Sequence, residues 1–78
     1  MDWNFRNDQP IYSQLTQRLT EAIVSGIYAP GEKLPSVREL AVEAGVNPNT
    51  VQRALSELAR AGLVFSQRTA GRFVTENE

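Results

Sequence analysis

The stretch from Gly45 to Leu55 constrains this chain more than any other, because it predicts where one helix ends and the next begins. Gly45 is typical of a helix C-terminus, where a left-handed backbone conformation costs glycine almost nothing. Asn47 predicts the N-cap of the next helix, and Pro48 suits the first helical position, where an N–H would lack a partner. Two helices joined by so short a connection form a helix-turn-helix.

The second helix of this unit is predicted over about residues 48–61, because Gly62 ends it. Its apolar residues recur at the i, i+3, i+4 and i+7 spacing of a buried stripe, which comprises Val51, Ala54, Leu55 and Leu58. The same spacing places four hydrogen-bonding residues on another face, namely Asn49, Gln52, Arg53 and Ser56. A helix anchored on one side and polar on the other suits insertion into the major groove of DNA.

Two more helices are predicted before it. Asp8 is expected to cap the first, with Pro10 in its first turn. This helix runs to about Ser25 and ends at Gly26, and Ile27 is expected to pack back onto it. Its buried stripe comprises Tyr12, Leu15, Leu19 and Ile23. The aromatic residues Trp3 and Phe5, which precede the helix, are expected to pack on it.

The second predicted helix begins with a capping box. Ser36 accepts a hydrogen bond from the N–H of Glu39, whose carboxylate reaches back to Ser36. Arg38 points outward in the first turn. The residues expected to be buried are Val37, Leu40, Ala41 and Ala44.

A β-hairpin is predicted after the third helix. Residues 63–65 and 72–75 are β-prone, and residues 66–71 form a polar tip of five or six residues. The apolar residues expected to cover the helices are Leu63, Val64, Phe65, Phe73 and Val74. The predicted fold is mainly α with a small β-hairpin, a winged helix-turn-helix of three helices plus wing over residues 10–75. Residues 1–9 are expected to form an N-terminal arm, and 76–78 a tail.

The composition excludes several classes of function. The chain of 78 residues has no cysteine and no histidine, so the commonest metal ligands and general base are absent, and we expect no cofactor, no metal and no enzymatic activity. No run is long enough to span a membrane and no signal peptide is evident, which favours a cytoplasmic protein.

The charge is unevenly distributed along the chain. Residues 33–72 contain six cations and three anions, whereas the remainder contains two cations and six carboxylates. A basic segment within a chain of formal net charge −1 is typical of a local nucleic-acid footprint, although an ordinary mixed surface fits as well.

Several segments together resemble the N-terminal domain of GntR-type bacterial transcription regulators, and the Asn-Pro-Asn-Thr-Val run is most similar to the YtrA-like subgroup. The resemblance spans residues 10–74 and rests on these segments: Pro10-Ile11-Tyr12-Ser13-Gln14-Leu15, Ser25-Gly26, Pro30-Gly31-Glu32-Lys33-Leu34-Pro35-Ser36-Val37-Arg38-Glu39-Leu40-Ala41, Val46-Asn47-Pro48-Asn49-Thr50-Val51-Gln52-Arg53-Ala54-Leu55 and Gly71-Arg72-Phe73-Val74.

The resemblance implies roles for particular residues. It implies that Arg38 contacts DNA, that Thr50 contacts a phosphate, and that Gly71 lets the wing approach the minor groove. Together with the exposed polar residues, this predicts DNA contacts from Ser36, Arg38, Asn49, Thr50, Gln52, Arg53, Arg68, Gly71 and Arg72. The chain departs from the family where many members have arginine at the positions of Pro48 and Gln52, glycine at Ala70 and threonine at Arg72. Arg53 takes over the cation of the recognition helix.

The family also has an effector-binding or dimerisation region after the wing, and the chain stops before it. We therefore expect the intact protein to bind a two-fold symmetric operator in double-stranded DNA as a homodimer, and the 78-residue chain to be monomeric.

Blander alternatives stay open for the charged residues. Arg38 could be a plain surface charge, and Arg53 could pair with Glu57 at i+4. Arg68 and Arg72 are expected to contact the DNA backbone from the wing, but they could be free solvated charges. A winged helix that binds protein is a further alternative, but it would present an apolar or acidic helix face.

Overall fold

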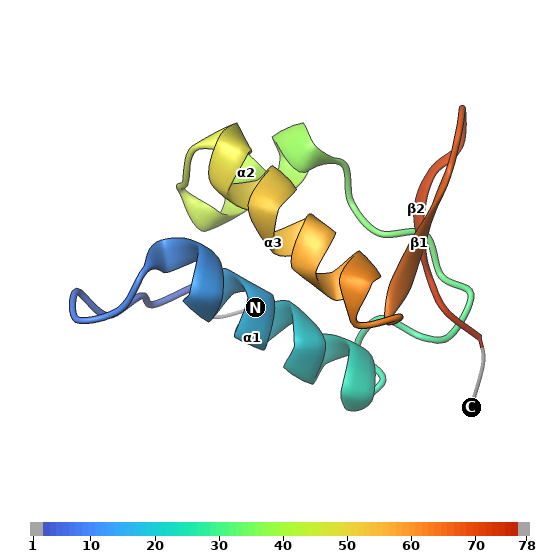
Figure 1. Cartoon of the computed structure of the whole chain (residues 1–78), viewed down its shortest axis with the longest axis horizontal. Coiled ribbons are helices and arrows are strands. Elements are labelled where there is room, and N and C mark those ends of the chain that lie inside the picture. The colour runs from blue at the N-terminus through green and yellow to red at the C-terminus, as the bar shows by residue number, and fades with distance from the viewer. Residues whose placement is uncertain (1–2, 77–78) are drawn as a thin grey trace.

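The computed structural model describes residues 3–76, and within that range three helices are followed by one hairpin (Figure 1). The elements in chain order are α1 (Ile11–Val24), α2 (Val37–Ala44), α3 (Pro48–Arg60), β1 (Val64–Gln67) and β2 (Gly71–Val74). The predicted winged helix-turn-helix fold is confirmed. Of the predicted arm and tail, residues 1–2 and 77–78 lie outside the described part of the chain.

The start of α1 differs from the prediction. Pro10 occupies the N-cap and no side chain caps the helix. The Asp8 carboxylate instead forms an ion pair with Arg6, so the prediction that Asp8 caps α1 is wrong. Asp8 lies two residues before the N-cap, because Pro10 itself has an extended backbone conformation that precedes the first helical turn.

The arm before α1 is held by Gln14, a buried residue of that helix. Its Oε1 accepts from the Arg6 N–H at 2.6 Å, and its Nε2 donates to the carbonyls of Arg6 at 2.8 Å and Gln9 at 3.0 Å. Further along, the Arg18 guanidinium donates to the Asn4 carbonyl at 2.7 Å. These bonds satisfy backbone groups that the irregular arm could not pair by itself.

The helix-turn-helix forms as its capping residues predict. Ser36 and Glu39 make both hydrogen bonds of the capping box, and the Asn47 side chain accepts from the Asn49 N–H at 2.8 Å. Gly45 ends α2 with a φ of 69°. This left-handed conformation requires glycine for its low cost, so the turn between α2 and α3 is encoded locally.

The core lies where α1, α2 and β1 each pack against α3 (Figure 1). Its buried members come from all five elements and are led by Leu15, Leu19, Leu40, Val51, Leu55, Leu58, Val64 and Val74. Tyr12, Ile23 and Val37 are only half-buried. Trp3 and Phe5 pack against this core, as predicted, with ring centroids 6.1 Å apart. The central position of α3 means that α1, α2 and β1 all pack on it and hold its outer face toward solvent.

The end of α1 also differs from the prediction. Ile27 is 62% exposed and does not pack back onto the helix. Tyr28 packs against the core in its place, and its N–H donates to the Ala22 carbonyl at 3.1 Å. Gly26 has a φ of 89°, and this reversal turns the second residue after it inward rather than the first.

The hairpin is longer in its strands and shorter at its tip than predicted. Residues 68–70 form the turn, and Gln67 pairs with Gly71. The connection between α1 and α2 runs along the free edge of β2, where the Leu34 N–H donates to the Arg72 carbonyl at 2.8 Å and Lys33 forms a bridge with Phe73. Pairing on both edges holds β2 rigidly beside α3.

One hairpin residue is placed differently from the prediction. Val64 and Val74 are buried and Leu63 and Phe73 half-buried, but Phe65 is exposed. Its ring stacks on that of Phe73 across the hairpin, with centroids 5.8 Å apart. Alternation along a strand explains this, because the residue after the buried Val64 must point to the opposite face.

Candidate nucleic-acid interface

The two faces of α3 differ as its sequence predicts. The stripe of Val51, Ala54, Leu55 and Leu58 is buried. On the outer side, Asn49, Gln52, Arg53 and Ser56 are exposed. An exposed, hydrogen-bonding helix face mounted on a fixed core is the chemical requirement for reading base edges.

Arg53 is held by an aromatic ring. Its Cζ lies 3.6 Å from the centroid of the Tyr12 ring, so α1 supports a guanidinium carried by α3. A cation over an aromatic face at an exposed site is stabilised by about 0.5–1 kcal/mol. Glu57 pairs with Arg60 at 3.8 Å, so the alternative of an Arg53–Glu57 pair is not realised. Sequence periodicity assigned Tyr12 to the core and gave no signal for this contact.

Gln52 and Arg72 contact each other across the junction of α3 and β2. The Arg72 Nη2 donates to the Gln52 Oε1 at 3.1 Å, and both side chains remain accessible. Arg72 lies within β2, opposite Ser66, and not in the tip. The structure therefore brings one predicted helix residue and one predicted wing residue into a single pair.

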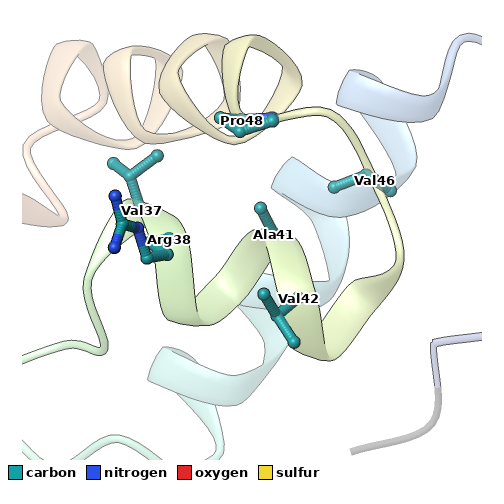
Figure 2. Close-up of a pocket in the computed structure, with 6 residues that line it drawn as sticks. All are labelled: Val37, Arg38, Ala41, Val42, Val46 and Pro48. Atoms are coloured by element: carbon teal, nitrogen blue, oxygen red, sulfur yellow. The ribbon is translucent and has the colours of Figure 1, made fainter.

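Arg38 borders a shallow groove of about 450 Å³ between α2 and the start of α3 (Figure 2). The side chains that line it are Val37, Arg38, Ala41, Val42, Val46 and Pro48. Figure 2 shows Arg38 in the first turn of α2 beside Val37. Within residues 3–76 no hydrogen bond or ion pair engages the Arg38 side chain, so its five N–H donors are available to a ligand.

Ser36 has a structural role in the cap of α2. Its Oγ accepts from the Glu39 N–H at 3.0 Å, and its own N–H donates to the Glu39 Oε1 at 2.8 Å. The bonds from the backbone N–H and hydroxyl of Ser36, and to a lesser degree the charge of Lys33, lower the pKa of the Glu39 carboxyl.

Arg68 and Gly71, near the tip of the hairpin, make none of the side-chain contacts described above. Arg68 is exposed in the turn, and no described residue pairs with it. Gly71 has a φ of 106°, and a Cβ built there would lie 3.0 Å from the Cε of Lys33. The backbone conformation therefore favours glycine at this position, independently of any ligand.

Asn49 and Thr50 lie in the first turn of α3, where they share a small pocket with Ile11, Tyr12 and Arg53. The Asn49 side chain is exposed and Thr50 is half-buried. The structure thus brings together Tyr12, Asn49, Thr50 and Arg53 as one group and Gln52 with Arg72 as another. Sequence reasoning missed Tyr12, because a half-buried aromatic at core spacing has the signature of a packing residue.

Within residues 3–76 no three His, Cys, Asp or Glu side chains are placed to hold a metal ion. None of the helices in the same range has the length and hydropathy of a membrane span. Within the described part of the chain, the surface around α3 combines several of the predicted functional residues.

A protein family and several known proteins match most of this chain. Residues 11–74 match the family described as bacterial regulatory proteins, gntR family. The HTH-type transcriptional repressor YtrA of Bacillus subtilis is 47% identical over 72 residues, which cover 92% of this chain and 55% of the repressor. The resemblance to YtrA-like members is thereby confirmed.

Solved structures share the fold as well. A GntR family transcriptional regulator from Listeria monocytogenes superposes with a TM-score of 0.91 at 42% identity, over 94% of this chain and 64% of that one. The AraR DNA-binding domain in complex with operator ORX1 superposes with a TM-score of 0.85 at 28% identity, over 92% of this chain and 93% of that one.

The chain spans less than two thirds of the YtrA repressor and of the Listeria regulator. The part it spans contains all three helices and the hairpin. The chain belongs to the gntR family of bacterial regulatory proteins, as the winged helix-turn-helix DNA-binding domain of a transcriptional regulator.

Proposed function

We propose that this domain binds double-stranded DNA sequence-specifically, with α3 in the major groove and the hairpin, over about residues 65–72, on the backbone and minor groove. The observation that carries the proposal is the outer face of α3. It is polar and exposed, its opposite side is fully buried, and arginines from α2 and the hairpin flank it. The AraR domain, which has the same fold, is in complex with operator DNA.

The proposal divides the predicted contacts by chemistry. Amide and guanidinium groups on the helix suit base edges, so we assign base contacts to Asn49, Gln52 and Arg53. Phosphate contacts position the protein without reading sequence, and we assign them to Ser36, Arg38, Thr50, Arg68 and Arg72. Gly71 is assigned the role of letting the wing approach the DNA closely. The local excess of cations over residues 33–72 supports this division.

The intact protein is proposed to act in the bacterial cytoplasm as a homodimer on a two-fold symmetric operator, with no catalytic step. The dimer contacts belong to a region beyond this domain. Among residues 3–76 the exposed large apolar residues are Val24 at the end of α1, Ile27 just after it, Val42 in α2 and Phe65 in β1. Scattered residues of this kind do not provide the roughly 800 Å² per partner of a standard interface.

The isolated chain should therefore be monomeric at micromolar concentration and bind a half-site weakly. Joining two copies should tighten binding, because the second half-site is then engaged at high effective concentration. Analytical ultracentrifugation of the 78-residue chain measures its oligomeric state. A stable dimer would contradict the assignment of the dimer contacts to another region.

The DNA proposal itself is tested by selection from a random DNA pool with two joined copies, followed by titration of the selected site at several salt concentrations. Phosphate neutralisation releases counterions, so the logarithm of affinity should fall with the logarithm of salt by about 0.9 per contact. Failure to enrich any sequence, or binding that is flat between low and moderate salt, would refute the proposal.

A further inference from the structure

The contact between Arg72 and Gln52 joins two residues that are twenty positions apart and belong to different elements. Both side chains lie at the surface proposed to face DNA, yet each is already engaged with the other in the free protein. A residue that only neutralised phosphates would need no such partner. The pair therefore determines which end of the Gln52 amide can meet a base.

The chemistry of the pair sets the orientation of the glutamine amide. Arginine has five N–H donors and no acceptor, so only the Gln52 oxygen can face the guanidinium. The Gln52 Nε2 group is thereby turned away from Arg72. An amide without such a partner can rotate by half a turn and present either its oxygen or its nitrogen at little cost.

Arg72 can exert this constraint because its own backbone is fixed. It lies opposite Ser66 in the hairpin, and its carbonyl accepts from the Leu34 N–H at 2.8 Å on the other edge of β2. Gly71, the residue before it, packs closely on the Lys33 side chain. The guanidinium thus starts from a strand that is held on both sides and beside α3.

We propose that Arg72 is a specificity-positioning residue, which holds the Gln52 amide so that its nitrogen is the end offered to DNA as a hydrogen-bond donor. This rests on the proposed DNA-binding function. In the major groove guanine, adenine and thymine each present an acceptor, whereas cytosine presents only its amino group as a donor. The base that Gln52 faces is therefore selected against cytosine, and Arg72 is the cause of that selection.

The test compares half-sites that carry each of the four bases at every position, bound by the 78-residue chain and its variants in competition titrations. Gln52→Ala identifies the position that Gln52 reads. At that position the wild-type chain should bind the cytosine site roughly tenfold more weakly than the best site, within the range of a good base contact. Arg72→Ala should reduce this penalty severalfold, and adding Gln52→Ala to it should remove little further preference.

Two variants separate positioning from general binding. Arg72→Lys keeps a donor near Gln52 and should restore part of the discrimination against cytosine. Arg68→Ala, on the tip of the same hairpin and without a described partner, should weaken binding to all four sites by one common factor. If Arg72→Ala also acts by one common factor, Arg72 is an ordinary backbone contact and the inference is overturned.

A measurement without DNA distinguishes failure of the inference from failure of the proposed function. In ¹⁵N-correlated NMR spectra the side-chain NH₂ signals of Gln52 are identified by their loss in Gln52→Ala. They should shift in Arg72→Ala and stay in place in Arg68→Ala. Unshifted Gln52 signals in Arg72→Ala would overturn the inference even if DNA binding is intact, whereas absence of any selected DNA would overturn the proposed function.

Discussion

The arginines of this surface fall into two groups that differ in how they are held. At its centre, Arg53 lies over the Tyr12 ring and Arg72 is bonded to Gln52. At its edges, Arg38 in α2 and Arg68 in the hairpin tip have no hydrogen-bond or ion-pair partner among residues 3–76. A side chain that is ordered before binding loses less entropy on binding and tolerates fewer ligand geometries.

This difference assigns the two groups different tasks. The held arginines at the centre can support discrimination between base edges, Arg53 by its own donors and Arg72 through the Gln52 amide, because these groups are positioned before DNA arrives. Free arginines at the edges can follow phosphates whose exact positions vary with DNA sequence, so they supply affinity without preference. Substitutions at these arginines and at their supporting residues test this comparison.

Arg53→Ala should have the largest effect. Loss of a held base contact should cost roughly 1–3 kcal/mol at the matched site and relax preference at one position. Arg60→Ala is the matched control, because Arg60 lies on the same helix at its far end and pairs with Glu57. Titration of both variants against matched and mismatched sites measures the effect. Equal losses on all sites for Arg53→Ala would remove the distinction between centre and edge.

Arg38→Ala and Arg68→Ala should each weaken binding to every sequence alike, by about 1 kcal/mol near 0.1 M salt, since each removes about 0.9 from the salt slope. Titrations at several salt concentrations measure that slope. A change in base preference for either variant would show that an edge arginine reads sequence, and the comparison would then fail at that edge.

Tyr12→Leu should have a smaller effect of about 0.5–1 kcal/mol on affinity for the matched site, because Arg53 stays in place but loses the ring beneath it. Tyr12→Phe keeps an aromatic face and should bind nearly as well as the wild-type chain. Thermal unfolding of both variants controls for packing, since Tyr12 is half-buried. Equal affinity of the leucine and phenylalanine variants would mean that the ring does not position Arg53.

The contacts of Arg53 with Tyr12 and of Arg72 with Gln52 could not be predicted from the sequence. The ends of α2 and α3 and their buried stripes depend on local capping and periodicity, and residues such as Ser36, Gly45 and Asn47 specify them without reference to distant segments. The exposed face of α3 follows from the same periodicity. The sequence therefore predicts which residues of α3 are exposed, but not how the candidate residues are grouped.

The grouping depends on tertiary structure. Arg72 is grouped with Arg68 in the sequence as a wing charge beside the predicted tip, because the sequence does not show which strand residue the fold brings to α3. In the structure Arg72 lies in β2, opposite Ser66. Its contact with Gln52 arises only when the hairpin closes over α3. Gln14 was missed for the same reason, since its partners are backbone groups of an arm that has no regular structure.

The smallest expected effect concerns pH and the cap beneath Arg38. The Ser36 bonds lower the pKa of Glu39 in the folded state, so the unfolded state binds the proton more readily. The resulting stability is present above the carboxyl pKa of the unfolded chain and is lost as the pH falls through the lowered folded value. Thermal unfolding of the wild-type chain should show this acid loss, and it should be smaller in Glu39→Gln.

Glu43→Gln is the control for this pH effect, because it removes a carboxylate from the same helix outside the capping box. It should keep the acid loss that Glu39→Gln diminishes. The cap also bears on the comparison of the arginines, because Arg38 follows it by two residues and the cap helps to order the turn that carries Arg38. If Glu39→Ala, which removes the acceptor for the Ser36 N–H, weakens DNA binding at neutral pH as much as Arg38→Ala, the edge arginine depends on the cap for its position and belongs with the held group.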